Sequence, residues 1–590
     1  MGIALVELAS GGGILMNFLD WSVVFVYLAG MIYMSYSLGK KQEDMKSYYL
    51  GGNNLSWWSI GISTMANQCS TNSLLGAPAF IITTGMLWLQ YEFAVPLAMI
   101  IIMVFLLPFY RKLNLISVYR YLELRFGVGT RTTLSILFQF LRAFGTGVTV
   151  YGIAIVLQEI IGLPFHWAVI ILGVVTIIYD MLGGMEAVVL SDVIQMVILY
   201  LGILMCLIYS IDAVGGFGQV MEWFPKTGEA LAGLGDLAPK ATFHGFQTVD
   251  FEGHGLGDGK TFAFLPMLFG GLFLYVSYYG CDQTQVQREM SSKDVDDTNL
   301  SLMLNGFMRF PLVLTYCFLG VCIGAYIAKN PEFLQALFSP TDQAYNFNLA
   351  VPKFILMNLP HGIIGLVIVA LFSAAMSSLD STINSLSATT IRDIYERFFV
   401  EGGQLAPEKE LFMSRVFTVF WGVLCVVFSF FVGNISDSII ESVNKIASLA
   451  NGPILALFLM GILTRRCNGY GATAGLLAGL AFNAALWLWA PGVSWLWWNV
   501  IGFLVAFVVG YLISTLTRLS LEISALENGS FKAVPVVDDP SKEDLKGLIY
   551  TRNISEYFEY RLNWPRNYAY MMLYTVFMIG FSVWLGRIGA

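Results

Sequence analysis

The sequence contains few charged residues. Aspartate, glutamate, lysine and arginine account for 12% of its 590 residues, whereas 57% are hydrophobic. Soluble globular proteins carry about 25% charged residues, so this composition excludes an ordinary water-soluble domain and predicts a protein embedded in lipid. The net charge is −8, and a chain without an excess of basic residues is not expected to bind nucleic acid.

Signals of metal sites, disulfides and catalysis are also scarce. The seven cysteines lie mostly in apolar segments, and their spacing matches neither a zinc site nor a disulfide framework. His244 and His254 share a loop with Asp250 and Glu252, where a metal site and a solvated loop are both open interpretations. The sequence has no HExxH motif, no catalytic aspartate pair in a glycine-rich context and no Ser–His pair in an apolar segment. An intramembrane enzyme is therefore not expected.

Long apolar runs, by contrast, are abundant. A helix needs about 20 apolar residues to cross a bilayer, and about fourteen segments are candidates by this criterion. Tryptophan and tyrosine gather at segment ends, as they do at membrane interfaces. We therefore expect an all-α polytopic membrane protein. The predicted spans lie near residues 17–36, 56–84, 91–110, 133–159, 165–182, 187–212, 263–287, 302–328, 361–395, 410–433, 439–464, 470–490, 494–517 and 567–586.

The basic residues indicate how these helices are oriented. Most lysines and arginines fall in alternate connections, and the side that carries them is the cytoplasmic one. Both termini and the loop 213–262 are then outside, and the segment 518–565 is inside. The first residues lack the basic start and cleavage site of a signal peptide, so we expect them to lead into the first helix. The basic residues on the predicted cytoplasmic side include Lys40, Lys41, Lys46, Arg111, Lys112, Arg120, Arg125, Arg131, Arg288, Lys293, Arg392, Arg397, Lys409, Arg465 and Arg466.

Two predicted helices contain polar interruptions. The segment "GISTMANQCSTNSLLGAPAFIITTG" (61–85) places amides and hydroxyls within a span, and "SYYGCDQTQVQRE" (277–289) does the same five helices later. Interruptions at matching places in two halves indicate an inverted-repeat transporter whose binding sites lie at the breaks. A glycine or proline kink would explain either segment alone, but the pair at this spacing favours the transporter.

A later span, "FSAAMSSLDSTINSLSATTIRDIY" (372–395), combines many hydroxyls with a carboxylate. Its small and hydroxyl residues recur at helical spacing on one face, and an ionisable residue within the membrane usually marks an ion or substrate pathway. An oxygen-rich face suits a small hard cation. The alternative is that these hydroxyls bond to their own helix or to a neighbouring one. The face consists of Ala374, Ser377, Ser378 and Ser381, flanked by Asp380 and Asn384.

Four motifs carry a family resemblance: "YYLGGNNLSWWSIGIS" (48–63), "GGMEAVVLSDVIQ" (183–195), "DQTQVQRE" (282–289) and "AAMSSLDSTINSLSATTIRDIY" (374–395). They resemble the sodium/solute symporter family, which includes transporters of glucose, galactose, proline and sialic acid. The resemblance runs from about Met16 to Thr464, and less specifically through the trailing helices. It implies a LeuT-type core with a 5+5 inverted repeat, and alternating access driven by a Na⁺ gradient across the cell membrane.

The resemblance also implies an organisation along the chain. Residues 1–55 would hold a lead-in and the first helix, and residues 56–464 the ten-helix transport core. Residues 465–590 would hold accessory helices, with the cytoplasmic loop at 518–565.

The family's common sodium site falls, by position, on five residues of this sequence. The implied ligands are the backbone carbonyls of Ala66, Cys69 and Ala374 and the hydroxyls of Ser377 and Ser378.

A second sodium site is also implied. Members that have one use positions matching Asp192, Asp380 and Ser381. Asp380 stands where a serine or threonine is common. An additional carboxylate beside Asp192 favours either a second cation or a proton shared between the two, and the sequence leaves both open.

The implied solute site is less uniform. Glu92, in "QYEF" (90–93), matches an acceptor of sugar hydroxyls, and Tyr278 matches an aromatic residue that closes over the sugar. Arg309 replaces a lysine, and its planar fork keeps a carboxylate solute among the alternatives. Arg142 lies about one turn from the carboxylate-binding arginine of sialic acid transporters, with a gating or capping role as its alternative. Further implied contacts, where this chain departs from other members, are Ser73, Tyr275 and Asn444.

Together these features predict a Na⁺-coupled symporter that imports a small polar solute, with a sugar or polyol favoured. An acidic sugar, an amino acid or an organic anion is the alternative. A transporter-like sensor would usually carry a signalling domain, and the segment between Thr517 and Asn563 is shorter than a typical domain of about 50–200 residues. The lipid bilayer is the other expected partner, and the oligomeric state does not follow from the sequence.

Overall fold

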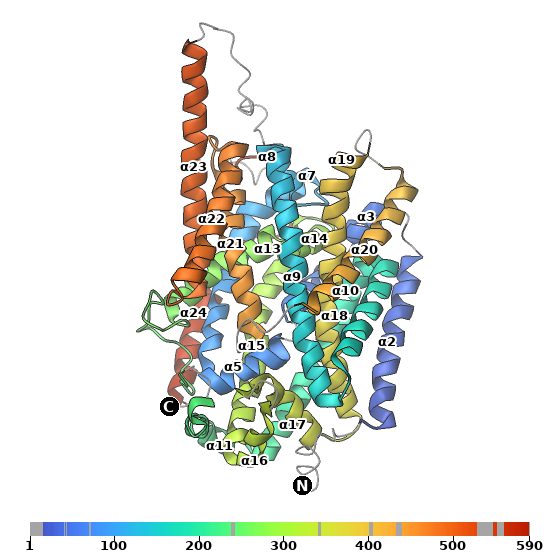
Figure 1. The fold of residues 1–590 in the computed structure, drawn as a ribbon, viewed down its shortest axis with the longest axis vertical. Helices are drawn as coiled ribbons and strands as arrows, with labels where there is room; N and C mark the ends of the chain where they lie inside the picture. Colours follow the sequence, from blue (N-terminus) through green and yellow to red (C-terminus); the bar gives the residue numbers. More distant parts are fainter. Residues whose placement is uncertain are drawn as a thin grey trace.

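The computed structural model describes residues 16–588 except 41, 43, 70–71, 238–241, 340–343, 401–404, 432–438, 528–546 and 551–559. Regular structure in this part of the chain is helical, apart from a two-residue antiparallel strand pair, β1 (Phe338–Ser339) and β2 (Ala344–Tyr345). The helices form one elongated bundle (Figure 1). The prediction of an all-α polytopic fold is therefore confirmed.

The helices of the leading segment and the first half are α2 (Phe18–Gly39), α3 (Met45–Leu50), α4 (Trp57–Gln68), α5 (Ala77–Thr84), α6 (Val95–Ile101), α7 (Leu107–Leu113), α8 (Arg120–Phe126), α9 (Val128–Ile161), α10 (Phe165–Val214), α11 (Phe217–Trp223) and α12 (Thr227–Ala232). Those of the second half are α13 (Gly271–Cys281), α14 (Gln283–Met290), α15 (Val295–Lys329), α16 (Pro331–Ala336), α17 (Ala350–Asn358), α18 (Ile363–Thr389), α19 (Glu396–Phe399), α20 (Pro407–Ser429) and α21 (Ile439–Leu463). The trailing helices are α22 (Gly469–Trp489), α23 (Trp495–Glu527) and α24 (Trp564–Ile588). Short 3-10 and π turns extend several of them: Gly51–Asn53, Asn72–Gly76, Met86–Ala94, Ile102–Leu106, Gly235–Leu237, Pro266–Gly270, Phe347–Leu349 and Thr390–Tyr395.

Eleven helices in the described residues are long and apolar enough to cross a membrane. One of them, α10, has 50 residues and would be about 75 Å long if straight, far more than the roughly 30 Å hydrocarbon core. It bends at Gly184, whose φ of 54° and ψ of −156° are not helical, so it supplies two crossings. The interrupted pairs α4–α5 and α13–α14 supply two more, which agrees with the predicted total of about fourteen.

Both helices predicted to be interrupted are interrupted. In the first, α4 ends at Gln68, and Cys69 has a non-helical ψ of 65°. In the second, α13 ends at Cys281, and the extended backbone of Asp282 separates it from α14. The Asp282 carboxylate accepts a hydrogen bond from the Thr284 backbone N–H at 2.8 Å and so caps the new helix.

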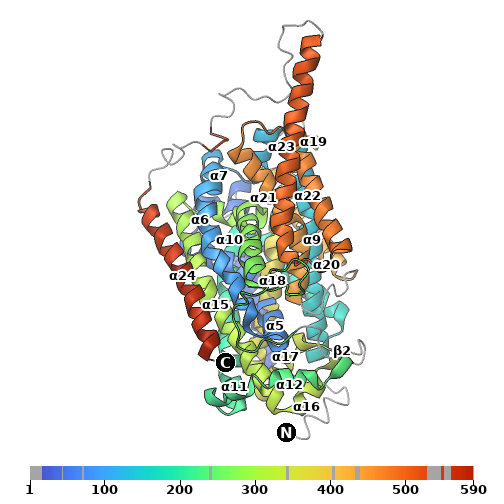
Figure 2. The same ribbon diagram turned by 90° about the vertical axis from the view of Figure 1, so that its left-hand side faces the viewer.

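The oxygen-rich span forms the centre of the bundle. Helix α18 packs against α2, α9, α10 and α20. The trailing helices are divided: α22 and α23 pack on α21, whereas α24 packs on α6 and α15 (Figure 2). Helix α2 begins and α24 ends at the same end of the molecule (Figures 1 and 2), as an even number of crossings requires. Which end faces the cytoplasm stays a prediction.

Part of the connection before α24 docks on the core. Leu548 and Ile549 are buried. The Tyr121 hydroxyl donates to the Leu548 carbonyl at 2.8 Å, and the Tyr550 backbone N–H donates to the Ile462 carbonyl at 2.8 Å. Residues 547–550 therefore join the ends of α8 and α21. The part of the predicted cytoplasmic loop from 528 to 546 lies outside the described residues.

The leading helix holds the start of α18 through one carboxylate. Asp20, on α2, is fully buried. Its Oδ1 accepts hydrogen bonds from the backbone N–H groups of Gly362 at 2.6 Å and Gly365 at 3.0 Å, and its Oδ2 lies 2.7 Å from His361 Nδ1. A carboxylate at a helix N-terminus satisfies free N–H groups and interacts favourably with the helix dipole.

Replacing Asp20 by alanine should therefore destabilise the protein by about 1–3 kcal/mol, because the N–H groups of Gly362 and of the buried Gly365 lose their acceptor. Thermal unfolding of the purified protein in detergent measures this loss. Ser22→Ala is the matched control, since that hydroxyl donates to Phe18 of its own helix at an exposed position, and it should change stability by less than about 0.5 kcal/mol. An Asp20→Ala protein that unfolds at the wild-type temperature would contradict this account of the cap.

Candidate functional site

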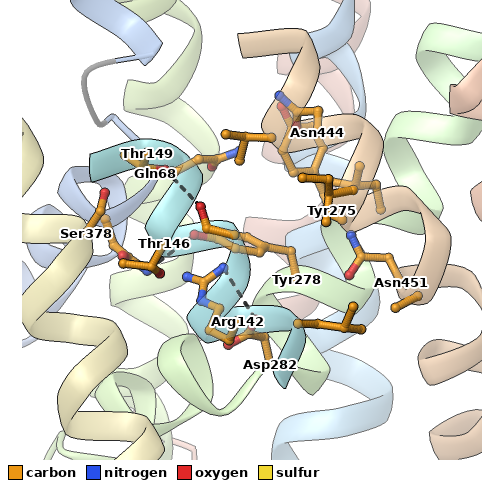
Figure 3. Close-up of a pocket in the computed structure, with 18 of the residues that line it drawn as sticks. Gln68, Arg142, Thr146, Thr149, Tyr275, Tyr278, Asp282, Ser378, Asn444 and Asn451 are labelled. Carbon is orange, nitrogen blue, oxygen red and sulfur yellow. Dashed lines mark hydrogen bonds and ion pairs between the residues drawn. The ribbon is translucent and has the colours of Figure 1, made fainter. Parts of the chain in front are cut away.

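The two helix interruptions border one cavity near the centre of the bundle (Figure 3). The end of α4 and the helix α13 form part of its wall, and α9, α18 and α21 contribute further lining residues. Its polar lining includes Asn67, Gln68, Tyr91, Glu92, Arg142, Thr146, Thr149, Tyr275, Tyr278, Asp282, Arg309, Tyr316, Ser378, Thr382, Asn444 and Asn451.

Most residues of the predicted solute site meet in this cavity. Ser73 belongs to the π turn Asn72–Gly76, but its side chain lies outside what the structure describes. The predicted residues that line the cavity are Glu92, Tyr275, Tyr278, Arg309 and Asn444.

Glu92 and Arg309 form a buried ion pair. Arg309 Nε lies 3.0 Å from Glu92 Oε2, and both side chains are at most 5% exposed. The Tyr275 hydroxyl donates to the other carboxylate oxygen at 3.2 Å, and Arg309 Nη1 donates to Cys69 Sγ at 3.2 Å. Each charge is thus neutralised by the other, and Tyr275 acts as a partner of Glu92 in this wall of the cavity.

Arg142 is held more loosely. Its Nη1 lies 3.7 Å from Asp282 Oδ2, and its side chain is 24% exposed. Its guanidinium also lies over the Tyr278 ring, 5.6 Å from the ring centroid. Arg142 Nε is buried without a hydrogen-bond partner among the described residues. Because an unpaired buried donor is costly, this guanidinium has bonding capacity left for an anion in the cavity.

The residues of the predicted common sodium site lie where α4 ends beside α18. Ala66, Cys69, Ala374 and Ser377 border one small space between these helices, and Ser378 faces the main cavity. The Ser377 hydroxyl donates to the Ala374 carbonyl at 3.2 Å. Carbonyl and hydroxyl oxygens at a helix break fit the preference of Na⁺ for hard oxygen ligands. That these residues bind Na⁺ stays a prediction.

The predicted second sodium site contains a residue that the sequence did not point to. Asp192, Asp380 and Ser381 are all buried, and Arg288 lies among them. Arg288 Nη2 is 3.1 Å from Asp192 Oδ2 and also donates to the Ser381 hydroxyl. Arg288 Nε donates to the Ser63 hydroxyl at 2.8 Å, and Ser63 donates to Asp192 at 2.5 Å. A guanidinium thus provides the positive charge that the sequence assigned to a second cation or a proton.

Arg288 is fully buried within the protein. The sequence predicts it among the basic residues of the cytoplasmic side, and that side stays a prediction. Its pairing with Asp192 offsets the cost of removing the charge from water.

Asp380 is held by other groups. Its Oδ2 accepts from the hydroxyls of Tyr179 and, at 3.4 Å, Ser191, and its Oδ1 accepts from the Ser381 hydroxyl at 3.0 Å. Each of these donors is neutral. In the described part of the chain, Asp380 therefore contacts no basic side chain.

The histidine-containing loop is held by contacts within the loop itself, between His254, Asp258 and the backbone. His254 Nδ1 lies 3.5 Å from Asp258 Oδ2, and the Asp258 carboxylate accepts backbone N–H bonds from His254 and Lys260 at 2.7 and 3.1 Å. The bond from the His254 N–H lowers the pKa of Asp258. Among the described residues, no three His, Cys, Asp or Glu side chains converge as they would around a metal ion.

Sequence comparison identifies the family. The family model described as the sodium:solute symporter family matches residues 48–479. The sodium/sialic acid symporter NanT of Aliivibrio fischeri is 29% identical over 472 residues, covering 80% of this chain and 87% of that protein. Human sodium-coupled monocarboxylate transporter 1 is 27% identical over 479 residues, covering 80% of this chain and 73% of that protein.

Structural comparison supports the same fold. A solved structure of a Na⁺-coupled sialic acid symporter in a substrate-bound outward-open state matches with a TM-score of 0.74 and 24% identity, covering 85% of this chain and 98% of that one. The LeuT-type fold is thereby confirmed. Because the family model spans well over half of the sequence, the chain belongs to the sodium:solute symporter family, and is a multi-pass membrane transporter that moves small solutes with Na⁺ rather than an enzyme.

Proposed function

We propose that this protein imports an acidic, hydroxylated solute together with Na⁺, and that Arg142 binds the carboxylate of the solute. The observation that carries this proposal is the difference between the two arginines of the cavity. Arg309 is paired with Glu92 at 3.0 Å, whereas Arg142 is 3.7 Å from Asp282 and has a buried Nε without a partner among the described residues. A carboxylate can make charge-assisted hydrogen bonds with such a guanidinium.

The remaining polar groups favour a solute with hydroxyl or amide groups. Asn67 Oδ1 and Asn451 Nδ2 are buried without hydrogen-bond partners in the described part of the chain. A solute that draws the Arg142 guanidinium away from Asp282 also has to offer the Asp282 carboxylate a hydrogen-bond donor, such as a hydroxyl or an amide N–H. A site with such groups discriminates against solutes that leave them unpaired. An acidic sugar meets these requirements better than a short monocarboxylate does.

The relatives point in the same direction. Two of the proteins similar to this chain are sodium/sialic acid symporters, and others are sodium-coupled monocarboxylate transporters. An acid as solute, the alternative in the sequence argument, fits these names better than the neutral sugar or polyol that the sequence favoured.

A binding screen on the purified protein tests the proposal. Sialic acid, lactate, proline, glucose and sorbitol are added in NaCl or in choline chloride, and sialic acid and lactate are each compared with the uncharged methyl ester. Ligand binding raises the unfolding temperature by mass action. The proposal predicts a shift with an acid in NaCl and none with its ester. A shift with glucose or sorbitol alone would contradict the acidic solute.

We further propose that Na⁺ binds the carbonyls of Ala66, Cys69 and Ala374 and the hydroxyls of Ser377 and Ser378. Ser377→Ala should then raise the Na⁺ concentration that gives half-maximal binding or uptake by about tenfold, since one ligand lost costs about 1–2 kcal/mol. Thr389→Ala is the control on the same helix, because that hydroxyl donates to the Ser385 and Leu386 carbonyls of its own helix. An unchanged sodium dependence in Ser377→Ala would remove Ser377 from the ligand set.

A further inference from the structure

A third buried aspartate lies beside the two of the predicted second sodium site. Asp180, on α10, is fully buried, and Asn384 Nδ2 donates to its Oδ1 at 3.2 Å. Its Oδ2 is also buried and has no hydrogen-bond partner among the described residues. Neither the solute cavity nor the predicted sodium sites include this carboxylate.

The charges in this region are unbalanced. Asp180, Asp192 and Asp380 are each fully buried. Arg288 is the cation among them, and its ion pair is with Asp192. In the described residues, no basic side chain forms an ion pair with Asp180 or Asp380. A carboxylate in the membrane interior without a counter-charge is costly, so this region is suited to accept a small cation.

The acids form a row rather than a single cluster. No three acidic, His or Cys side chains of the described chain converge on one point, which argues against a divalent metal site. Asn384 lies four residues after Asp380 on α18, about one turn or 5.4 Å further along the helix axis. The neighbour of Asp180, Tyr179, donates a hydrogen bond to Asp380. Asp180 is therefore displaced from Asp380 toward the end of α18 that leads to α19, the predicted cytoplasmic end.

We propose that Asp180 and Asn384 form an additional Na⁺ station on the release side of the predicted second sodium site. The Asp180 carboxylate supplies the charge. The Asn384 amide, whose Nδ2 faces Asp180 and whose Oδ1 accepts from Gln287 Nε2 at 2.8 Å, supplies a second ligand when it turns its oxygen toward the ion. A Na⁺ ion that leaves Asp380, which has no basic partner among the described residues, then meets a carboxylate about one helical turn closer to the predicted cytoplasmic end. This inference rests on the sodium-coupled part of the proposed function and not on the nature of the solute.

Asp180→Asn tests the station, because it removes the charge at nearly constant volume. Two uptake modes are compared in proteoliposomes, using whichever compound the binding screen identifies, whether acidic or neutral. Net uptake into a sodium-free lumen requires Na⁺ release, whereas solute exchange with equal NaCl on both sides does not. The station predicts that Asp180→Asn lowers net uptake by about tenfold and leaves exchange within about twofold of the wild type.

Matched variants separate charge from packing. Asp180→Glu retains the carboxylate and should restore most of the net uptake. Glu289→Gln is the control, since Glu289 is equally buried but both of its oxygens accept hydroxyl hydrogen bonds, from Thr64 at 2.9 Å and Ser301 at 2.5 Å. It should change neither mode. If Asp180→Asn does not fold, Asn384→Ser should reproduce the selective loss of net uptake.

Two results would overturn the station: wild-type net uptake in Asp180→Asn and Asn384→Ser, or an equal loss of net uptake and exchange. A neutral solute in the screen would contradict the proposed acidic substrate, yet the ratio of the two uptake modes would still decide the role of Asp180.

Discussion

Arg142→Gln is expected to weaken binding of the acidic solute by about 100-fold, because a carboxylate held in the cavity loses its charge-assisted hydrogen bonds, which are worth about 1.5–3 kcal/mol each. Asp282 also loses its counter-charge and then repels the solute. Arg142→Lys should retain part of the affinity, since lysine supplies the charge without the planar fork. The concentration dependence of uptake and of the thermal shift measures both variants.

The matched control is an arginine outside the cavity. Arg392→Gln removes a guanidinium that pairs with Glu396 at 2.7 Å, and it should leave the affinity for the solute unchanged. Wild-type affinity in Arg142→Gln would assign the arginine to gating or capping, the alternative that the sequence left open.

Arg288→Gln is expected to destabilise the protein by about 3–5 kcal/mol in the absence of Na⁺, because removing one partner of a buried ion pair leaves Asp192 without a counter-charge. The loss should be smaller in NaCl than in choline chloride. Without the guanidinium, Asp192, Asp380 and Ser381 offer their oxygens to Na⁺, and ion binding to the folded state offsets part of the loss. Thermal unfolding in the two salts measures the difference.

Arg111→Gln serves as the control for this variant. Arg111 is another arginine in a buried network, where it donates to the Ser292 and Glu289 carbonyls at 3.0 and 2.8 Å, and it lies outside the group of aspartates. Its destabilisation should be the same in both salts. An Arg288→Gln protein that is equally destabilised in both salts would show that Asp192 and Asp380 do not bind Na⁺ when the guanidinium is absent.

Much of the fold follows from the sequence for simple physical reasons. Crossing a bilayer requires long apolar helices, so the spans were recognisable from composition and length. The breaks near Cys69 and Asp282 were recognisable because polar side chains interrupt apolar runs there. The joining of two predicted spans into α10 was less evident, because the backbone bends within one turn at Gly184 and leaves no loop.

The candidate site was only partly predictable. Ser377 and Ser378 stand out because hydroxyls recur at helical spacing on an apolar helix. The pairing of Glu92 with Arg309 depends on which helices meet in space, and each residue alone suggested a contact to the solute. The pairing of Arg288 with Asp192 was not predicted, because Arg288 ends an apolar segment, where basic residues usually reach the cytoplasm, and Asp192 is far away in the sequence.

Uptake by proteoliposomes tests the central claim most directly. Sialic acid and lactate are each supplied outside with NaCl or with choline chloride, and the corresponding methyl ester is added in excess as a competitor. We expect uptake of an acid that requires external Na⁺ and is not inhibited by the ester. Uptake of sialic acid should exceed uptake of lactate. Equal uptake in both salts, or inhibition by the uncharged ester as strong as that by the unlabelled acid, would contradict sodium-coupled transport of a carboxylate bound by Arg142.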